Sequence, residues 1–215
     1  MVDHDDTLPR KEPSQERSRA LVDALVEATA RILETQGPEE VTTNRVAEIA
    51  GASIGSLYQY FPNKESLLAA VIERELSHDM DLARTLLQQN AHRPLTELVQ
   101  LLAEQLVDDT RSRLDLHHRM LPLIDDVHRA ELVRRKREEM SAVFTALLQA
   151  RKSELAPRLT EGIDAPEKLR CAAFIAMRAM ELSLNAAKVE APELLDRQEF
   201  GELLSRIFDA VMIQA

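Results

Sequence analysis

The side chains best suited to chemistry are concentrated in residues 41–68, which read VTTNRVAEIAGASIGSLYQYFPNKESLL. Hydroxyl, amide and cationic groups dominate this stretch, and no nucleophile has a base at a motif spacing that would predict catalysis. Groups of this kind bond to base edges and phosphates, which is the chemistry of nucleic-acid recognition. The candidate contact residues are Thr42, Thr43, Arg45, Ser53, Gly55, Ser56, Tyr58, Gln59, Tyr60 and Lys64.

Helix signals position these side chains. Thr42 and Ser53 each stand where an N-cap belongs, so that the hydroxyl can accept a hydrogen bond from an N–H of the first turn. Gly51 follows the first short helix, at a place where a left-handed conformation costs glycine little. Pro62 ends the second helix, and a third begins at about Lys64. The first helix has an apolar stripe formed by Val46, Ile49 and Ala50.

Two short helices joined by a turn that contains glycine form a helix-turn-helix pattern. In that motif the second helix lies in the DNA major groove, with its N-terminal residues facing the base edges. Here those residues are small and polar, and the hydroxyls of Tyr58 and Tyr60 can reach phosphates. The alternative is an ordinary helical corner with two partly exposed tyrosines.

The sequence from about Arg19 to Val71 resembles the DNA-binding domain of the TetR family of bacterial transcriptional regulators. The resemblance covers about a quarter of the chain, and the sequence departs from the family pattern at Ala52 and Ile54. The matching residues are Gly37, Thr42, Val46, Ala47, Ala50, Gly51, Ser53, Gly55, Leu57, Tyr58, Tyr60, Phe61, Lys64, Glu65, Leu67 and Leu68.

The resemblance implies a repressor that binds a palindromic operator in double-stranded DNA as a homodimer and is released by a small-molecule effector. It also implies that Thr43, the two tyrosines and Lys64 contact phosphates. Ser56 and Gln59 are the better candidates for base contacts, with Arg45 possible from the preceding helix. An activator of the same family and a helical protein-interaction module are the alternatives.

Composition favours an all-α protein of about nine helices. The chain has 215 residues but only 5 glycines, and strong helix formers dominate it. We expect a flexible arm over residues 1–15, a three-helix DNA-binding domain over 16–63, and a helical ligand-binding and dimerisation domain over 64–215. No apolar run reaches the length of a membrane span, and no hydrophobic signal core is visible, so a cytoplasmic location is expected.

Periodicity places the helices along the chain. We expect a helix before Gly37, a long helix from Lys64, a short helix cut by Pro122, and a loop over residues 157–166. Asp125 and Asp126 are expected to cap the helix that follows them. The last two helices are rich in apolar residues, and in the resembling family they form a four-helix dimer interface. The expected ranges are 15–36, 64–89, 94–110, 111–124, 127–155, 166–189 and 196–214.

The net charge of -10 argues against a general nucleic-acid coating protein but permits a local basic surface near the reading helices. In the expected arm, Arg10 and Lys11 can approach phosphates, although a disordered tail explains them equally well. The basic residues 134–137 are followed by acidic residues four positions further along the helix. This spacing indicates a solvent-exposed face on which basic and acidic side chains form ion pairs.

Three polar residues lie in the apolar helix at 166–189 and need an explanation. Similar regulators hold a small molecule in this part of the fold, and an Arg178–Glu181 ion pair is the alternative explanation. The candidate ligand-binding residues are His117, Met120, Phe174, Met177, Arg178, Glu181 and Asn185.

Other chemistry is not indicated. His117 and His118 are adjacent and point about 100° apart on a helix, so they cannot chelate one metal ion together. No HExxH, CxxC or glycine-rich phosphate loop is present, and we expect neither an enzyme nor a cofactor. Cys171 is the only cysteine, and a buried free thiol is the expected reading.

Overall fold

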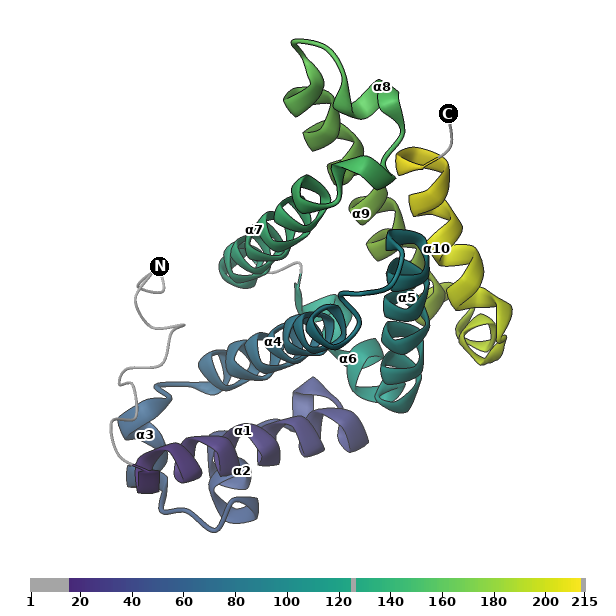
Figure 1. Ribbon diagram of the computed structural model, residues 1–215. Coiled ribbons are helices and arrows are strands. Elements are labelled where there is room, and N and C mark those ends of the chain that lie inside the picture. Colours follow the sequence, from purple (N-terminus) through teal and green to yellow (C-terminus); the bar gives the residue numbers. More distant parts are fainter. Residues whose placement is uncertain (1–15, 125–126, 214–215) are drawn as a thin grey trace. The chain divides into compact units, whose positions relative to one another are not determined.

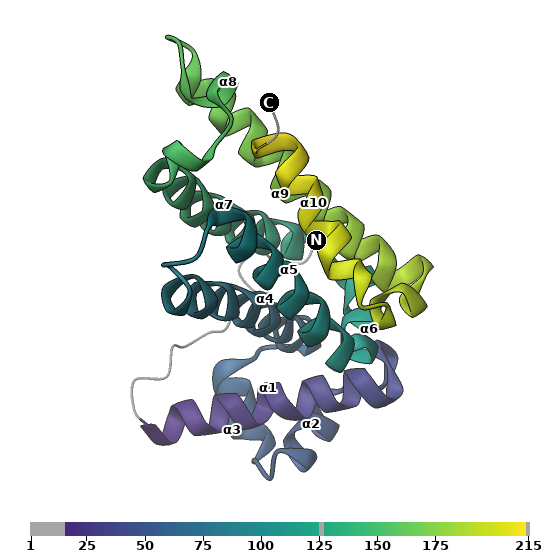
Figure 2. The same ribbon diagram turned by 45° about the vertical axis from the view of Figure 1, so that its right-hand side comes forward.

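The computed structural model describes residues 16–124 and 127–213 (Figures 1 and 2). Over these residues the chain forms ten α-helices, three short 3-10 helices and no strand, which confirms the all-α prediction. Residues 1–15 and Asp125–Asp126 lie outside the described residues, and the expected arm and helix cap lie there with them.

The N-terminal helices are α1 (Glu16–Gln36), η1 (Pro38–Glu40), α2 (Thr43–Ile49), α3 (Ile54–Tyr60) and α4 (Lys64–Gln89). The next elements are α5 (Leu95–Ser112), α6 (Leu114–Ile124), α7 (Val127–Ala150), η2 (Lys152–Glu154) and α8 (Pro157–Thr160). The chain ends with α9 (Ala165–Glu190), η3 (Pro192–Asp196) and α10 (Glu199–Met212).

The chain divides into two compact units, and the division differs from the predicted boundary at residue 63. Unit 1 contains the residues up to Ser77 together with Asp115–Val133, and unit 2 contains His78–Leu114 and Arg134–Ala215. Helix α4 therefore contributes its first half to unit 1 and its second half to unit 2.

A single hydrophobic core explains why unit 1 extends beyond the short helices. Leu67, Leu68 and Val71 of α4 and Leu116 of α6 are buried in the same cluster as the side chains of α1–α3. Helices as short as α2 and α3 are marginal alone, so this burial stabilises them. The other members of the cluster are Leu25, Val26, Ala28, Ala30, Ile32, Leu33, Val41, Val46, Ala47, Leu57, Tyr60 and Phe61.

In unit 2, α10 packs against both α5 and α9. Phe208 of α10 is fully buried and meets Phe144 of α7 edge to face, with ring centroids 5.8 Å apart. The two helices α10 and α5 approach closely at Gly201, where an added Cβ would lie 2.9 Å from the Cα of Glu104. Only glycine fits there without displacing backbone atoms.

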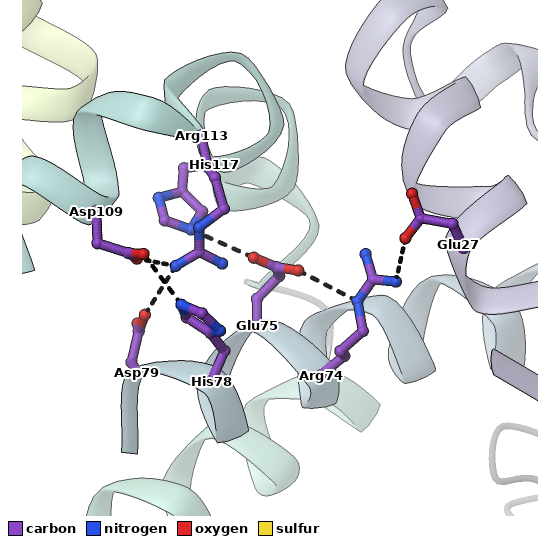
Figure 3. Close-up of polar contacts among 8 residues, drawn as sticks. All are labelled: Glu27, Arg74, Glu75, His78, Asp79, Asp109, Arg113 and His117. Carbon is purple, nitrogen blue, oxygen red and sulfur yellow. Dashed lines mark hydrogen bonds and ion pairs between the residues drawn. The ribbon is translucent and has the colours of Figure 1, made fainter. Parts of the chain in front are cut away.

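A chain of polar contacts accompanies the half of α4 that lies in unit 1 (Figure 3). Arg74 bonds to Glu27 of α1 at 2.8 Å and to the buried Glu75 at 3.3 Å. Glu75 in turn lies 3.7 Å from Nε2 of the buried His117 of α6. These contacts connect α1, α4 and α6 within one unit.

A second polar cluster holds the half of α4 in unit 2 (Figure 3). Asp109 of α5 accepts hydrogen bonds from Arg113 and from Nε2 of His78, the latter at 3.0 Å, and Arg113 also reaches Asp79 at 3.3 Å. Burial by itself raises the pKa of the Asp109 carboxyl, but the hydrogen bonds from Arg113 and His78 have the larger combined effect. The pKa of Asp109 therefore lies below its ordinary value. Burial lowers the pKa of the nearby Lys188 of α9, opposed by the charge of Asp79.

Helix α6 ends at Ile124 as expected, but it begins at Leu114, three residues late, and Pro122 lies inside it without ending it. Helix α7 ends at Ala150, five residues before the expected end. The carboxylate of Glu154 accepts a hydrogen bond from the N–H of Leu95 at the start of α5, at 2.6 Å, and this contact directs the chain away from the axis of α7. The same bond lowers the pKa of Glu154.

Three further expectations change near the C-terminal helices. The expected loop after residue 157 contains the short helix α8, and the last helix begins three residues late, at Glu199, after the 3-10 turn η3. Cys171 is exposed and not buried, because it lies on a face of α9 that no other described element covers. The expected ion pairs of α7 are present and include Arg134–Glu138 and Lys136–Glu139.

The Asp109 cluster gives a pH prediction. Its folded pKa is lowered, so its contribution to stability is complete above about pH 4 and is lost as the pH falls through the folded pKa. Wild type should exceed Asp109→Asn in Tm at pH 5, and the gap should narrow between pH 4 and pH 3. A thermal-melt series measures this, with the exposed neighbour Asp108→Asn as the control. A gap that stays constant down to pH 3 would contradict the prediction.

Candidate nucleic-acid interface

Side-chain caps define the two short helices of unit 1. The hydroxyl of Thr42 accepts from the N–H of Arg45 at 3.3 Å and begins α2. The hydroxyl of Ser53 accepts from the N–H of Ser56 at 3.0 Å and begins α3. Between the helices Gly51 has φ +65°, a left-handed conformation that L side chains rarely adopt. The predicted caps and turn are therefore confirmed, and they fix the direction in which α3 starts.

One side of α3 is buried and the other is open to solvent. Leu57 and Tyr60 face the core of unit 1, followed by the fully buried Phe61 at the C-cap. The exposed residues of the helix are Ile54, Gly55, Tyr58 and Gln59. An exposed helix face with a glycine and an amide is suited to close approach to a polyanion and to base edges.

A hydrogen bond between side chains joins the two helices across this face. Oγ1 of Thr43 lies 3.1 Å from the hydroxyl of Tyr58. Both residues line an open hollow of about 360 Å³ on the surface of unit 1. The hollow is completed by Glu39, Val41, Thr42, Pro62, Asn63 and Lys64.

The start of α4 forms the other wall of this hollow. Asn63 caps α4 by accepting from the N–H of Ser66 at 2.8 Å, and Ser66 returns a bond to the Asn63 carbonyl. Nζ of Lys64 donates to the carbonyl of Pro38 at 3.3 Å, which holds the ammonium beside the hollow. A helix N-terminus next to a lysine attracts an anion such as a phosphate. The sequence signal for this cap is Asn-x-x-Ser at residues 63–66.

Several predicted contact residues are held by neighbours. Arg45 pairs with Glu40 at 2.8 Å, so its guanidinium is partly neutralised. The hydroxyl of Ser56 lies 2.8 Å from that of Ser53, which places Ser56 at the edge of the exposed face. Tyr60 is a correction: it is buried in the core of unit 1, because it lies on the same side of α3 as Leu57, and it does not belong to the exposed face.

Ile49 is a second correction. It was expected to face the core, but 42% of its surface is exposed at the end of α2. Ile54, at the start of α3, is 38% exposed. The two isoleucines therefore add apolar surface beside the polar residues of α3, and apolar side chains can contact the methyl group of thymine.

A larger hollow of about 610 Å³ lies elsewhere on unit 1, between α1 and α4. Three carboxylates line it, from Asp23, Glu27 and Glu73, with Arg74 as the basic residue. Its acidic rim repels phosphates, so the smaller hollow beside α3 is the better place for a nucleic acid.

The predicted ligand-binding residues do not form one site within either unit. His117 and Met120 are buried in unit 1, whereas the other five residues belong to α9 of unit 2. There Phe174 is 61% exposed, and Arg178 forms an ion pair with Glu181, which also pairs with Arg137 at 2.8 Å. The ion pair that we gave as the alternative explanation is therefore present. Met177 and Asn185 are partly buried on the same helix.

Neither of two other site classes is found in the part of the chain that the structure describes. No cluster of three histidine, cysteine or acidic side chains there is arranged to hold a metal ion. No described helix is both long and apolar enough to cross a membrane.

Comparison with known proteins adds a family to this geometry. The family described as "Bacterial regulatory proteins, tetR family" matches residues 25–71, which contain most of α1, all of α2 and α3, and the start of α4. A nucleoid occlusion factor, SlmA of Haemophilus ducreyi, is 38% identical over 64 residues, a match that covers 30% of this chain and 30% of that protein. The repressor KstR of Mycobacterium tuberculosis is 36% identical over 70 residues, covering 33% of this chain and 32% of KstR.

A solved structure extends the likeness of fold to the whole chain. SmeT, the repressor of the Stenotrophomonas maltophilia multidrug efflux pump SmeDEF, has a TM-score of 0.66 at 23% identity, covering 93% of both chains. SmeT is also known in a complex with triclosan. The family model therefore shows that residues 25–71 of unit 1 match the tetR family of bacterial regulatory proteins, and the solved structures show that the chain shares their fold.

Gly55 provides a test of whether the exposed face approaches DNA closely. An added Cβ would meet only Oγ of Ser53, at 3.9 Å, so Gly55→Ala should raise the free energy of unfolding by about 0.5–1 kcal/mol. The same methyl group should weaken DNA binding, because it stands between the helix backbone and the groove.

Gly201→Ala is the matched comparison, because its Cβ would clash with the backbone of α5. It should lower the free energy of unfolding by about 1–3 kcal/mol. Urea unfolding and a DNA titration measure both effects. Unchanged DNA affinity in Gly55→Ala would show that this face is not the contact surface.

Proposed function

We propose that this protein is a non-enzymatic repressor that binds a pseudo-palindromic DNA operator as a homodimer and releases it when a small molecule binds. The observation that carries the proposal is the exposed face of α3, flanked by a hollow that collects Thr43, Tyr58 and Lys64. Selecting the bound sequence from random duplexes with purified protein tests it, and the selected sites should contain two inverted half-sites.

Base readout is assigned to the exposed residues of α3. Gln59 projects from the solvent face and can form a bidentate bond with adenine. Gly55 allows the helix backbone to come close, and Ile54 offers an apolar contact for a thymine methyl. Ser56 and Arg45 are secondary candidates, because each already bonds to a neighbouring side chain.

Phosphate contact is assigned to the hollow. The N-terminus of α4 presents N–H groups, and Lys64 supplies a positive charge at the same place. Thr43 and Tyr58, already bonded to each other, can turn their hydroxyls to a phosphate oxygen. These contacts fix the register of α3 in the groove without selecting bases.

Dimer formation is supported by exposed apolar surface on the last two helices. Phe174, Ile175, Leu182 and Val189 of α9 and Leu203 of α10 are each more than half exposed in the single chain. Surface of this kind marks an interface with another molecule. A two-fold dimer would present two copies of α3 to an inverted repeat.

Effector response is supported by relatives and by the course of α4. A relative of the same fold is known with triclosan bound, and α4 runs from the hollow of unit 1 into the polar cluster of unit 2. A ligand that binds unit 2 differently in the bound and free states would shift α4 and change the affinity for DNA. Such coupling is reciprocal, so the operator must weaken effector binding by the same factor.

Lys64→Ala separates positioning from reading. Loss of one phosphate contact should weaken binding to every duplex about equally and reduce the slope of log affinity against log salt by about 1. Titrations of the selected site and of a scrambled site at several salt concentrations measure this. Lys152→Ala, an exposed lysine of unit 2, is the control and should leave the slope unchanged. A salt slope equal to that of wild type would remove Lys64 from the interface.

Gln59→Ala should behave differently. It should lose about 1–3 kcal/mol for the preferred base pair at one position of each half-site and relax the preference there. Binding to all single-base variants of the selected operator measures the change. A uniform loss across the variants would assign Gln59 to phosphate contact instead.

A further inference from the structure

The larger hollow of unit 1 takes no part in the function proposed above. It lies between α1 and α4, and none of its lining residues belongs to the exposed face of α3 or to the smaller hollow beside it. All of its lining residues belong to unit 1, so its walls are complete within one unit. Its volume of about 610 Å³ falls in the range of roughly 300–1,000 Å³ that sites for small molecules occupy.

The inner surface of this hollow is apolar. Val26 of α1 and Phe61, which precedes α4, line it although both are buried. Val22 and Ala24 of α1 and Ala70 of α4 are half-buried beside them. An aliphatic or aromatic group placed against these side chains would be removed from water, which favours its binding.

The rim of the hollow is acidic. Asp23 and Glu27 lie four residues apart on α1 and therefore on one face of it, and α4 contributes Glu73. Among the lining residues Arg74 is the basic one, and its guanidinium is shared between Glu27 at 2.8 Å and the buried Glu75 at 3.3 Å (Figure 3). The lining therefore carries an excess of negative charge.

Asp23 is the carboxylate best placed to accept a new partner. It is exposed, and among the described residues its side chain forms no ion pair or hydrogen bond. Glu27, by contrast, is already held by Arg74. A negative charge at the edge of an apolar surface attracts a cation and offers the rest of that molecule a place out of water.

We propose that the larger hollow binds a small organic cation in which an ammonium group is attached to an apolar body. The ammonium group lies beside Asp23, and the apolar body lies against Val26 and Phe61. Charge complementarity selects this occupant, because the acidic rim repels an anion and a neutral molecule leaves the excess negative charge unbalanced. A bare metal ion does not fit, since no three histidine, cysteine or acidic side chains among the described residues cluster to hold one.

Compounds of similar size and different charge test the proposal. The probes are the cation phenethylammonium, the neutral phenethyl alcohol and the anion phenylacetate, with methylammonium as a charge without an apolar body. Titration of isotope-labelled protein followed by NMR measures each dissociation constant and shows which backbone amides shift. Phenethylammonium should bind about fivefold or more tighter than the alcohol, which is the effect of one exposed ion pair. The amides of Ala24 and Ala70 should shift, and phenylacetate and methylammonium should not bind measurably.

Substitutions at the rim and on the inner surface test the location. Asp23→Asn removes a negative charge and should weaken phenethylammonium about fivefold, while leaving the affinity for the alcohol unchanged. Glu34→Gln is the matched control, because it removes one exposed carboxylate from the same helix outside the hollow and should change neither affinity. Ala24→Leu fills part of the hollow and should weaken both compounds about tenfold.

These measurements are independent of the proposed function. Each titration is performed without DNA, and the effector response was assigned to unit 2, whereas every lining residue here belongs to unit 1. Asp23 and Glu34 are exposed and Ala24 is half-buried, so the three variants should melt like wild type. A protein that binds no operator but still distinguishes the cation from the alcohol would retain this site.

Three results would overturn the proposal. Equal affinity for phenethylammonium and the alcohol would show that the rim does not recognise charge. Equal losses in Asp23→Asn and Glu34→Gln would show that the cation responds to the net charge of -10 and not to this hollow. Binding of a peptide of alternating lysine and leucine that depends on Asp23, without binding of phenethylammonium, would assign the hollow to a basic segment of a partner protein.

Discussion

The exposed face of α3 depends on one constraint: a seven-residue helix cannot be stable by itself. Helix α3 is held because Leu57, Tyr60 and Phe61 are removed from water on one side of it. Ser53 supplies a hydrogen-bond acceptor at its start, where backbone N–H groups have no partner within the helix. Burial of one face and capping of one end together leave the opposite face rigid and free to bind.

Helix α4 is also held by a small number of contacts. Its first half shares the core that holds α3, so the position of its N-terminal end, beside the hollow, depends on Leu67, Leu68 and Val71. Buried polar groups then restrict how the helix can sit in each unit. Glu75 satisfies Arg74 and His117 in unit 1, and Asp79 shares Arg113 with Asp109 in unit 2. Charges that lose water need these partners, so only a few orientations of α4 avoid an unpaired charge.

Local chemistry explains which parts of the structure could be predicted from the sequence. Thr42, Gly51 and Ser53 act through their own backbone neighbourhood, and α4 has both predicted ends because Lys64 follows a turn and polar residues follow Gln89. The exposure of Tyr58 and Gln59 on α3 follows the predicted pattern, whereas their contact with DNA stays a prediction. Tyr60 was misplaced because only its packing into the shared core of unit 1 decides which of two tyrosines is buried.

Long-range contacts explain the remaining differences. The end of α7 depends on Glu154 reaching Leu95, which is 59 residues away in sequence and leaves no local signal. The division of α4 and α7 between the units likewise depends on which apolar residues meet in three dimensions. Hydrophobic periodicity predicts that one face of a helix is buried, but it does not predict which other element covers that face.

Helix α9 shows where that ambiguity affects function. From the sequence, an apolar helix face with a few polar residues is interpreted as the wall of a ligand pocket if that face is assumed to be buried within the chain. The structure leaves Phe174 and Leu182 more than half exposed, and it pairs Arg178 with Glu181 on the surface of the helix. Exposure of four large apolar side chains on one face is costly in water, at roughly 25 cal/mol for each Å² of apolar surface. A partner surface of similar length would remove that cost, whereas a small ligand would cover only part of the stretch from Cys171 to Val189, which is about 27 Å long. Of the residues that the sequence suggested for a ligand, Phe174 and Arg178 belong to this helix of unit 2, whereas His117 and Met120 are buried in unit 1, so the suggested set does not form one pocket.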